Sequence, residues 1–141
     1  MSRFSNINKH MVTLLILMMW VGEFSSVITV DATRHVRIIN ELGEGYVLTI
    51  HCKSKDDDLG VHDLSYQKYF EWGFHDNLWG TTLFFCRIQW RNADVYFDIY
   101  DEKRDRFGCC EHWWAAKMDA LYSVNPKTGA ATKAWLRWHG N

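Results

Sequence analysis

The sequence has little excess of charge of either sign. Sixteen Lys and Arg residues stand against 17 Asp and Glu residues, which gives a formal net charge of −1. Proteins that bind nucleic acid usually carry a clustered basic patch, and capture by anionic lipid also needs basic clusters. Neither nucleic acid nor a membrane surface is therefore expected as a partner of this chain.

The sequence also lacks the short motifs that carry catalysis. No G-x-S-x-G, H-E-x-x-H or P-loop string is present. An acid/base pair could be drawn from His51 and Asp56, or from His75 and Asp76, but such pairs are common by chance. A working site would also need a nucleophile and a pocket, which the sequence does not reveal. We therefore expect no catalytic residues, no cofactor and no enzymatic activity.

Metal-binding patterns are missing as well. The cysteines and histidines form no C-x₂-C or H-x₃-H pair of the kind found in zinc sites. The run Asp56, Asp57 and Asp58 looks more suitable for calcium, but calcium loops place their ligands at alternate positions. Three adjacent carboxylates of an extended chain cannot point at one ion, so the run is interpreted as a solvated acidic loop. No N-x-[ST] sequon is present, and no N-linked glycan is expected.

Long apolar runs are absent, but a short one lies near the N-terminus. Residues 11–21 carry no charge and follow a polar segment with basic residues. The run is shorter than the about 20 residues that a membrane helix needs, and it is typical of a secretory signal peptide. We predict a signal peptide at 1–32, cleaved after Thr29 or Ala32, and one secreted domain at 33–141. A buried N-terminal helix is the alternative, but no amphipathic stripe supports it.

Four cysteines lie in the predicted mature chain: Cys52, Cys86, Cys109 and Cys110. An even number behind a signal peptide indicates two disulfides in an oxidising compartment. Adjacent cysteines can join each other only in a strained ring, so we set aside the pairing of Cys109 with Cys110. The two remaining connectivities each tie Cys52 and Cys86 to the dipeptide, and the residues do not separate them.

Short apolar and aromatic runs of period two, divided by turn residues, follow one another along the mature chain. No helical periodicity, internal repeat or linker is visible. The pattern predicts an all-β fold, a small antiparallel β-sandwich of about seven or eight strands stabilised by two disulfides. The expected strands are 36–40, 46–54, 69–74, 81–90, 95–100, 109–117, 121–124 and 134–138.

Alternation also predicts which way side chains point. In the strand 46–54 the apolar set includes Cys52, which is expected to face the core, so His51 faces outward. Residues 55–66 form a polar stretch, and the three aspartates are expected to lie beyond the strand, in a loop.

Tryptophan is abundant, with eight residues in the chain. Trp72 and Trp90 lie on apolar strand faces and are expected in the core. One of the neighbours Trp113 and Trp114 must point outward, and Trp79 in a turn is expected to be exposed. Exposed tryptophans stack on sugars or pack against proteins, so a secreted carbohydrate-binding module is the alternative function.

Several strings together resemble a known family. HCKSKDDDLG at 51–60 is followed by FEWGF at 70–74, TLFFCRIQW at 82–90 and CCEHWW at 109–114. Their order and spacing are similar to those of the plant self-incompatibility protein family, the S-protein homologues, over roughly residues 34–124. The resemblance implies a small secreted β-sandwich that is not an enzyme and acts as a signalling ligand. The adjacent cysteines depart from the family, whose last two cysteines are often separated.

The resemblance and the fold class together predict how the protein works. Loops of a rigid sandwich present variable chemistry, so a cell-surface receptor is expected to bind the loops 55–63, 75–80 and 101–108 of a monomeric ligand. Charge reversals at 101–104 are expected to alter binding without unfolding the domain. The candidate receptor-facing residues are Asp56, Asp57, Asp58, His75, Asp76, Asn77, Trp79, Asp101, Glu102, Lys103 and Arg104.

Overall fold

A computed structural model describes residues 12–13, 32–108 and 110–138 of the chain. The chain divides into two units, residues 1–30 and 31–141. Val12 and Thr13 have helical backbone. Apart from these two residues and Ala32, the predicted signal peptide, with the predicted cleavage site after Thr29, lies outside the described residues. None of the described helices combines the length and the apolar character needed to cross a bilayer.

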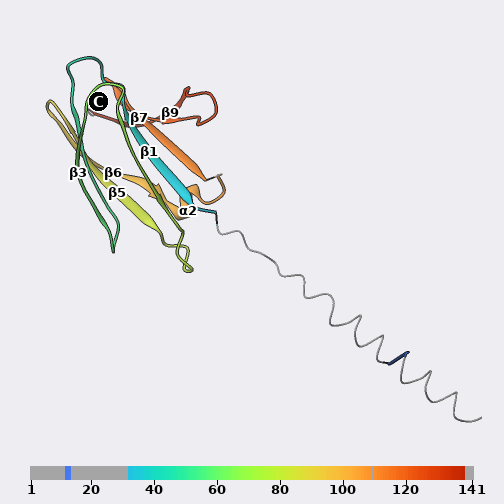
Figure 1. Ribbon diagram of the computed structural model, residues 1–141. Helices are drawn as coiled ribbons and strands as arrows, with labels where there is room; N and C mark the ends of the chain where they lie inside the picture. The colour runs from blue at the N-terminus through green and yellow to red at the C-terminus, as the bar shows by residue number, and fades with distance from the viewer. Residues whose placement is uncertain (1–11, 14–31, 109, 139–141) are drawn as a thin grey trace, which may run out of the picture. The chain divides into compact units, whose positions relative to one another are not determined.

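The second unit is built from two β-sheets (Figure 1). The first sheet has the strand order β4-β1-β7-β8-β9 and the second the order β3-β2-β5-β6. The all-β prediction is confirmed, with nine strands among the described residues rather than seven or eight. The elements are β1 (Arg34–Asn40), β2 (Leu48–Lys53), β3 (Asp58–Leu64), β4 (Tyr69–Phe74), β5 (Leu83–Trp90), β6 (Ala93–Asp101), α2 (Glu102–Asp105), β7 (Glu111–Ala116), β8 (Ala120–Val124) and β9 (Ala131–Arg137).

One strand pair corrects the prediction of an antiparallel fold. β1 lies between β4 and β7, antiparallel to the former and parallel to the latter. All other pairs among the described strands are antiparallel. Alternation in a sequence reports which face a side chain occupies and not the direction of the neighbouring strand, because both pairings have the same period of two.

The prediction of a loop for all three aspartates was wrong, because β3 begins at Asp58, within the polar stretch 55–66. β3 pairs only with β2 and forms an edge of its sheet. Most of its side chains are exposed or half-buried, and only Leu64 is buried. Gly60, at φ +79°, interrupts the pattern further. A polar edge strand of this kind has little apolar alternation and therefore resembles a loop in sequence.

The charged stretch after β6 was also predicted as a loop, but it contains the one-turn helix α2. Asp101 caps it, because its Oδ1 accepts a hydrogen bond of 3.0 Å from the N–H of Lys103. Four residues are too few to show a helical period.

The core lies between the two sheets and confirms the predicted faces. Trp72 and Trp90 are buried, as are the other inward residues of β5. Near the end of β6, Phe84 pairs with Tyr100 while Phe85 pairs with Asp98, so one extra residue is inserted. This bulge turns two consecutive β6 residues inward and buries Tyr100 completely.

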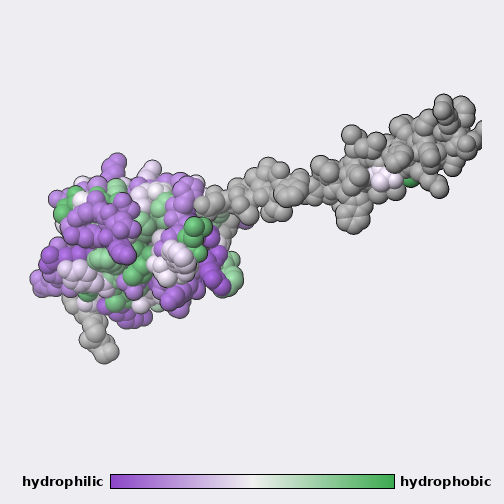
Figure 2. All heavy atoms as spheres, turned by 90° about the horizontal axis from the view of Figure 1, so that it is seen from below, coloured by the Kyte–Doolittle hydropathy of each residue, from purple (hydrophilic) through white to green (hydrophobic). Residues whose placement is uncertain are grey.

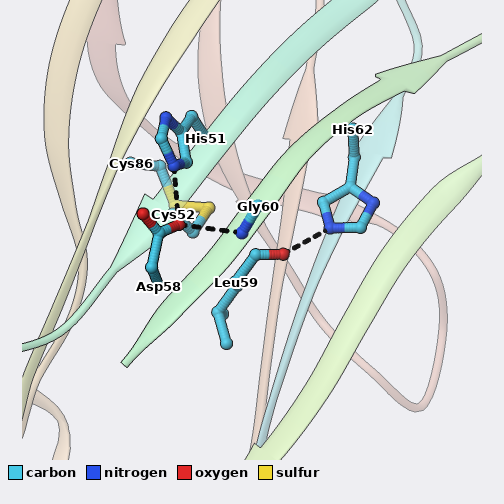
Figure 3. The surroundings of a disulfide bond; sticks show 7 residues. All are labelled: His51, Cys52, Asp58, Leu59, Gly60, His62 and Cys86. Carbon is cyan, nitrogen blue, oxygen red and sulfur yellow. Dashed lines mark hydrogen bonds and ion pairs between the residues drawn. A yellow bond between two sulfur atoms is a disulfide. The ribbon is translucent and has the colours of Figure 1, made fainter. Parts of the chain in front are cut away.

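The disulfide pairing corrects the sequence interpretation. Cys52 of β2 lies directly opposite Cys86 of β5, with their Cα atoms 4.0 Å apart, and the two sulfurs are bonded (Figure 3). The interpretation that tied both residues to the late dipeptide is therefore wrong. The side chains of Cys52 and Cys86 both point to the core, where directly paired residues of neighbouring strands lie close enough to bond. Cys109 lies outside the described residues, and a second disulfide stays a prediction.

Candidate functional site

Two of the three predicted receptor-facing segments meet in one groove. The β2–β3 turn and the β4–β5 loop lie at the same end of the domain (Figure 1). Between them the surface is hollowed by about 630 Å³, a volume within the usual range of ligand sites. Its described lining residues are Ser54, Lys55, Asp56, Asp57, Phe74, His75, Asn77, Trp79, Thr81, Thr82, Leu83, Phe84 and Phe85.

Ser54 shapes the β2–β3 turn on one side of the groove. Its backbone N–H donates a 2.8 Å hydrogen bond to the carbonyl of Asp57, and its Oγ accepts a 3.0 Å bond from the N–H of Asp57. A hydroxyl that binds its own turn in this way favours a tight corner. Lys55, Asp56 and Asp57 are exposed on that corner.

The third aspartate of the run behaves differently. Asp58 Oδ1 lies 2.7 Å from His51 Nε2 and accepts a 2.9 Å hydrogen bond from the N–H of Gly60 (Figure 3). Asp58 Oδ2 lies 3.1 Å from Lys53 Nζ. The Gly60 N–H first, and then His51 and Lys53, hold the pKa of Asp58 well below its usual range. Asp58 therefore closes the β2–β3 hairpin, and its charge is matched within the fold.

Asn77 organises the β4–β5 loop on the other side. Its Oδ1 accepts hydrogen bonds from the N–H groups of Trp79 (3.0 Å) and Thr81 (3.1 Å), and its Nδ2 donates to the Thr81 hydroxyl (2.9 Å). Its own N–H donates a 2.7 Å bond to Thr82 Oγ1. Gly80 completes the turn at φ +67°, a backbone conformation that favours glycine. Asn77 is thus committed to the loop itself.

The tip of this loop is apolar and exposed. Leu78 is 98% and Trp79 86% exposed. The exposure of Trp79 was predicted, whereas Leu78 was missed, although its place beside Trp79 in the same turn was a usable signal. Seen from this end of the domain, hydrophobic side chains form a patch bordered by hydrophilic ones (Figure 2).

Asp76, the second residue of the predicted loop 75–80, points inward. Its carboxylate accepts a 2.8 Å hydrogen bond from Arg34 Nε and a 2.6 Å bond from the Tyr100 hydroxyl. Burial of Tyr100, and then its bond to Asp76, raise the pKa of that hydroxyl above its usual value. Asp76 is therefore an anchor between the loop and the core, and the exposed His75 precedes it.

The third predicted segment does not line the groove, and some of its side chains bind groups within the fold. Glu102 is only 7% exposed, and its Oε2 accepts a 3.0 Å hydrogen bond from the N–H of Thr82. Its own N–H donates a 3.0 Å bond to the Thr82 carbonyl. Arg104 donates to the carbonyl of Asp98 and lies over the ring of Trp135. The candidates Asp101, Glu102 and Arg104 hold the loop in place, and Lys103 is exposed.

One of the two neighbouring tryptophans points outward, as predicted: it is Trp113, while Trp114 is buried. Trp113 is half-covered, because Arg37 lies 4.1 Å from its ring centroid and its Nε1 donates to Glu111. Arg37 also stacks on Tyr69. On this face of the five-stranded sheet, Arg37 therefore covers part of the Trp113 and Tyr69 rings.

The groove offers apolar surface and charged side chains. His51 contacts Asp58 rather than Asp56, and Asp76 is bound to Arg34 and Tyr100. The arrangement can bury apolar groups of a partner against Trp79 and match positive charge with the acidic turn.

The family model described as plant self-incompatibility protein S1 matches residues 35–138 of the chain. S-protein homolog 5 of Arabidopsis thaliana is 46% identical over 92 residues, which cover 65% of this chain and 71% of that protein. S-protein homolog 20 of the same plant is 44% identical over 94 residues, covering 65% of this chain and 64% of that protein.

A solved structure has the same fold, with a TM-score of 0.58, 23% sequence identity, and coverage of 76% of this chain and 97% of that one. It belongs to the SPH (Self-Incompatibility Protein Homologue) proteins, described as a widespread family of small, highly stable, secreted proteins from plants.

Proposed function

Because this chain belongs to the plant self-incompatibility protein S1 family, we propose that it is a secreted, non-catalytic signalling ligand. It binds a receptor protein at the cell surface through the β2–β3 turn and the β4–β5 loop. The 101–108 segment does not line the groove, and its Glu102 is hydrogen-bonded to Thr82 at the end of the β4–β5 loop.

The exposed pair Leu78 and Trp79 is the observation that carries the proposal. Large apolar side chains at the tip of a loop lose contact with water only when a partner covers them. Trp is also among the residues that dominate the energy of protein interfaces. Asn77 holds the loop in one shape before binding, which lowers the entropy that binding must overcome.

Secretion is part of the proposal. The solved SPH proteins are described as secreted, and the described domain of this chain contains a buried disulfide, a bond that persists in oxidising compartments. Expression of the full chain with its N-terminal segment in plant cells should place the product in the medium. N-terminal sequencing of that product should find a start after Thr29 or Ala32.

The binding test uses the secreted product, fluorescently labelled, on intact plant cells. We expect saturable binding that protease treatment of the cells abolishes. Trp79→Ala should weaken it by about tenfold or more, as expected for an interface hot spot. Phe107→Ala is the matched control, because Phe107 is 84% exposed but lies in another segment, and it should bind as the wild type does. Binding unaffected by protease, or equally weakened by both variants, would overturn the proposal.

A carbohydrate-binding role is the second candidate, and the exposed ring of Trp79 is the observation in its favour. A glycan array probed with the same labelled protein separates the two. Binding to a defined glycan that is lost in Trp79→Ala, together with protease-resistant binding to cells, would replace the receptor proposal.

A further inference from the structure

We propose that the groove takes an extended segment of the partner protein that carries an arginine or lysine next to an apolar side chain. The inference rests on the proposed receptor-binding function and specifies the chemistry of the partner. Three features of the groove carry it: an apolar floor, an acidic edge and an exposed tryptophan.

The floor is built from the ends of β4 and β5. Phe74 and Phe85 are half-buried, and Leu83 is 38% exposed. Phe74 is fixed by the core below it, since its ring centroid lies 4.5 Å from that of Phe84 and 4.8 Å from that of Tyr100. The floor is thus preformed, and a partner gains by covering its remaining apolar surface.

The edge of the groove has an excess of negative charge. Among the described lining residues, besides His75, one lysine, Lys55, stands against Asp56 and Asp57. Asp58 does not add to this excess, because His51 and Lys53 lie within 2.7 Å and 3.1 Å of its two oxygens. A partner whose charge complements this edge is positive.

A guanidinium group can contact both an aromatic ring and a carboxylate. The protein already contains one such arrangement, at Arg37. Arg37 lies 4.1 Å from the ring centroid of Trp113 and 4.3 Å from that of Tyr69, while its Nε donates a 2.5 Å hydrogen bond to Glu71. Trp79 and the carboxylates of Asp56 and Asp57 line the same groove, and none of its described lining residues is an arginine. An arginine from the partner can stack on Trp79 and bind an aspartate at once.

The geometry of both walls is set before the partner arrives. Ser54 closes the turn that carries the carboxylates, and Asn77 closes the loop that carries Trp79. The cross-strand disulfide joins the two strands that lead into the groove, β2 and β5. A short segment can therefore recognise charge and apolar surface together without ordering either loop.

The test is a nuclear magnetic resonance titration of the secreted product with acetyl-Leu-Arg-Phe-amide. Shifts are expected at the backbone amides of residues 54–57 and 77–85. The matched peptide acetyl-Leu-Gln-Phe-amide should bind at least about fivefold more weakly, because it cannot form the charge-assisted contacts. Equal binding of the two peptides, or shifts confined to other strands, would overturn the inference.

Two pairs of substitutions distinguish an effect of the charges at the groove edge from an effect of the net charge of the protein. Asp56→Asn with Asp57→Asn removes two negative charges from the groove edge, and Glu44→Gln with Asp98→Asn removes two exposed ones elsewhere. The first pair should weaken binding of the arginine peptide and of intact cells by about fivefold or more, and should reduce the effect of added salt. The second pair should leave the affinities for the arginine peptide and for intact cells within about twofold of the wild-type values. Equal losses in both pairs would overturn the inference.

The cell experiment keeps the two proposals distinguishable. If protease-sensitive binding to cells requires Trp79 but is unchanged by the substitutions at Asp56 and Asp57, the proposed receptor function stands. The inference that the partner segment carries a positive charge is then wrong. If labelled protein binds no cell but the arginine peptide still occupies the groove, the partner chemistry stands and its cell-surface location is wrong. Binding to protein-free phosphatidylcholine vesicles that depends on Trp79 would instead show lipid as the occupant and overturn the inference.

Discussion

The hydroxyl of Tyr100 donates a 2.6 Å hydrogen bond to the carboxylate of Asp76. Tyr100 is fully buried at the end of β6, and Asp76 belongs to the exposed β4–β5 loop, so this bond connects the core to the loop that carries Trp79. Arg34 completes the contact from β1. The β4–β5 loop, which lines the groove, is therefore held by a residue that is itself buried in the core.

Tyr100→Phe should destabilise the domain, because it removes the hydrogen bond and leaves a half-buried carboxylate with one partner fewer. Hydrogen bonds to charged groups contribute about 1.5–3 kcal/mol, and we expect a loss of that order in urea unfolding. Tyr122→Phe is the control: Tyr122 donates a 2.8 Å bond to Asp119 on the surface and should cost less than about 0.5 kcal/mol. Similar losses in the two variants would contradict the anchoring role.

The pairing of Cys52 with Cys86 predicts a single link between two tryptic peptides. Non-reducing peptide mapping of the secreted product should find the Cys52 peptide joined to the Cys86 peptide. The bond closes a loop of 34 residues, and the chain-entropy argument predicts that its loss costs about 3–4 kcal/mol. Urea unfolding of the Cys52→Ala, Cys86→Ala double variant measures this cost, to which lost packing adds. A map that links either residue to Cys110 would contradict the pairing.

His112 makes stability depend on pH. Burial lowers the pKa of its imidazole below the ordinary value of 6.5, with Arg34 and Arg104 acting in the same direction and Asp105 against it. The unfolded chain then binds a proton more readily than the folded one, so stability falls as pH drops below about 6.5 and levels off below the folded pKa. His112→Gln should flatten this part of the profile. An unchanged slope in thermal melts at several pH values would contradict the assignment.

Asn77→Ala should loosen the β4–β5 loop without unfolding the domain. The amide of Trp79 donates to the side-chain oxygen of Asn77, so native-state hydrogen exchange at this position should become much faster. Asn77→Asp keeps that acceptor and loses only the donor to the Thr81 hydroxyl, so it should protect the Trp79 amide better than alanine does. Equal exchange in both variants would show that the backbone alone holds the loop.

Side-chain direction was the part of the fold that the sequence predicted well. Alternation in β2 and β5 placed Cys52 and Cys86 in the core and His51 outside, as the structure has them. The alternation of apolar and polar residues carries no information on the order of the strands in a sheet. It therefore could not show that Cys52 and Cys86 are direct partners or that β1 runs parallel to β7. Those facts depend on which distant strands become neighbours.

For part of the groove, the sequence predicted which side chains are exposed. Composition identified Trp79, Asp56 and Asp57 as surface residues, and all three line the groove. It also counted Asp76 and Glu102 as surface charges, because a charged residue in a polar stretch is usually solvated. Both instead bind groups inside the fold, and only the coordinates of Tyr100 and Thr82 reveal this.

The neighbours Glu102 and Lys103 give a direct test of this distinction. Glu102→Lys should destabilise the domain by about 3 kcal/mol or more, because it removes the acceptor of the Thr82 amide and introduces an unmatched charge into a buried position. Lys103→Glu reverses a charge on an exposed side chain and should change stability by less than about 0.5 kcal/mol. Glu102→Gln keeps an oxygen acceptor and should fall between the two. Urea unfolding of the three variants measures the differences. If Glu102→Lys unfolds at the same urea concentration as Lys103→Glu, the segment after β6 is a free surface loop and belongs again among the receptor contacts.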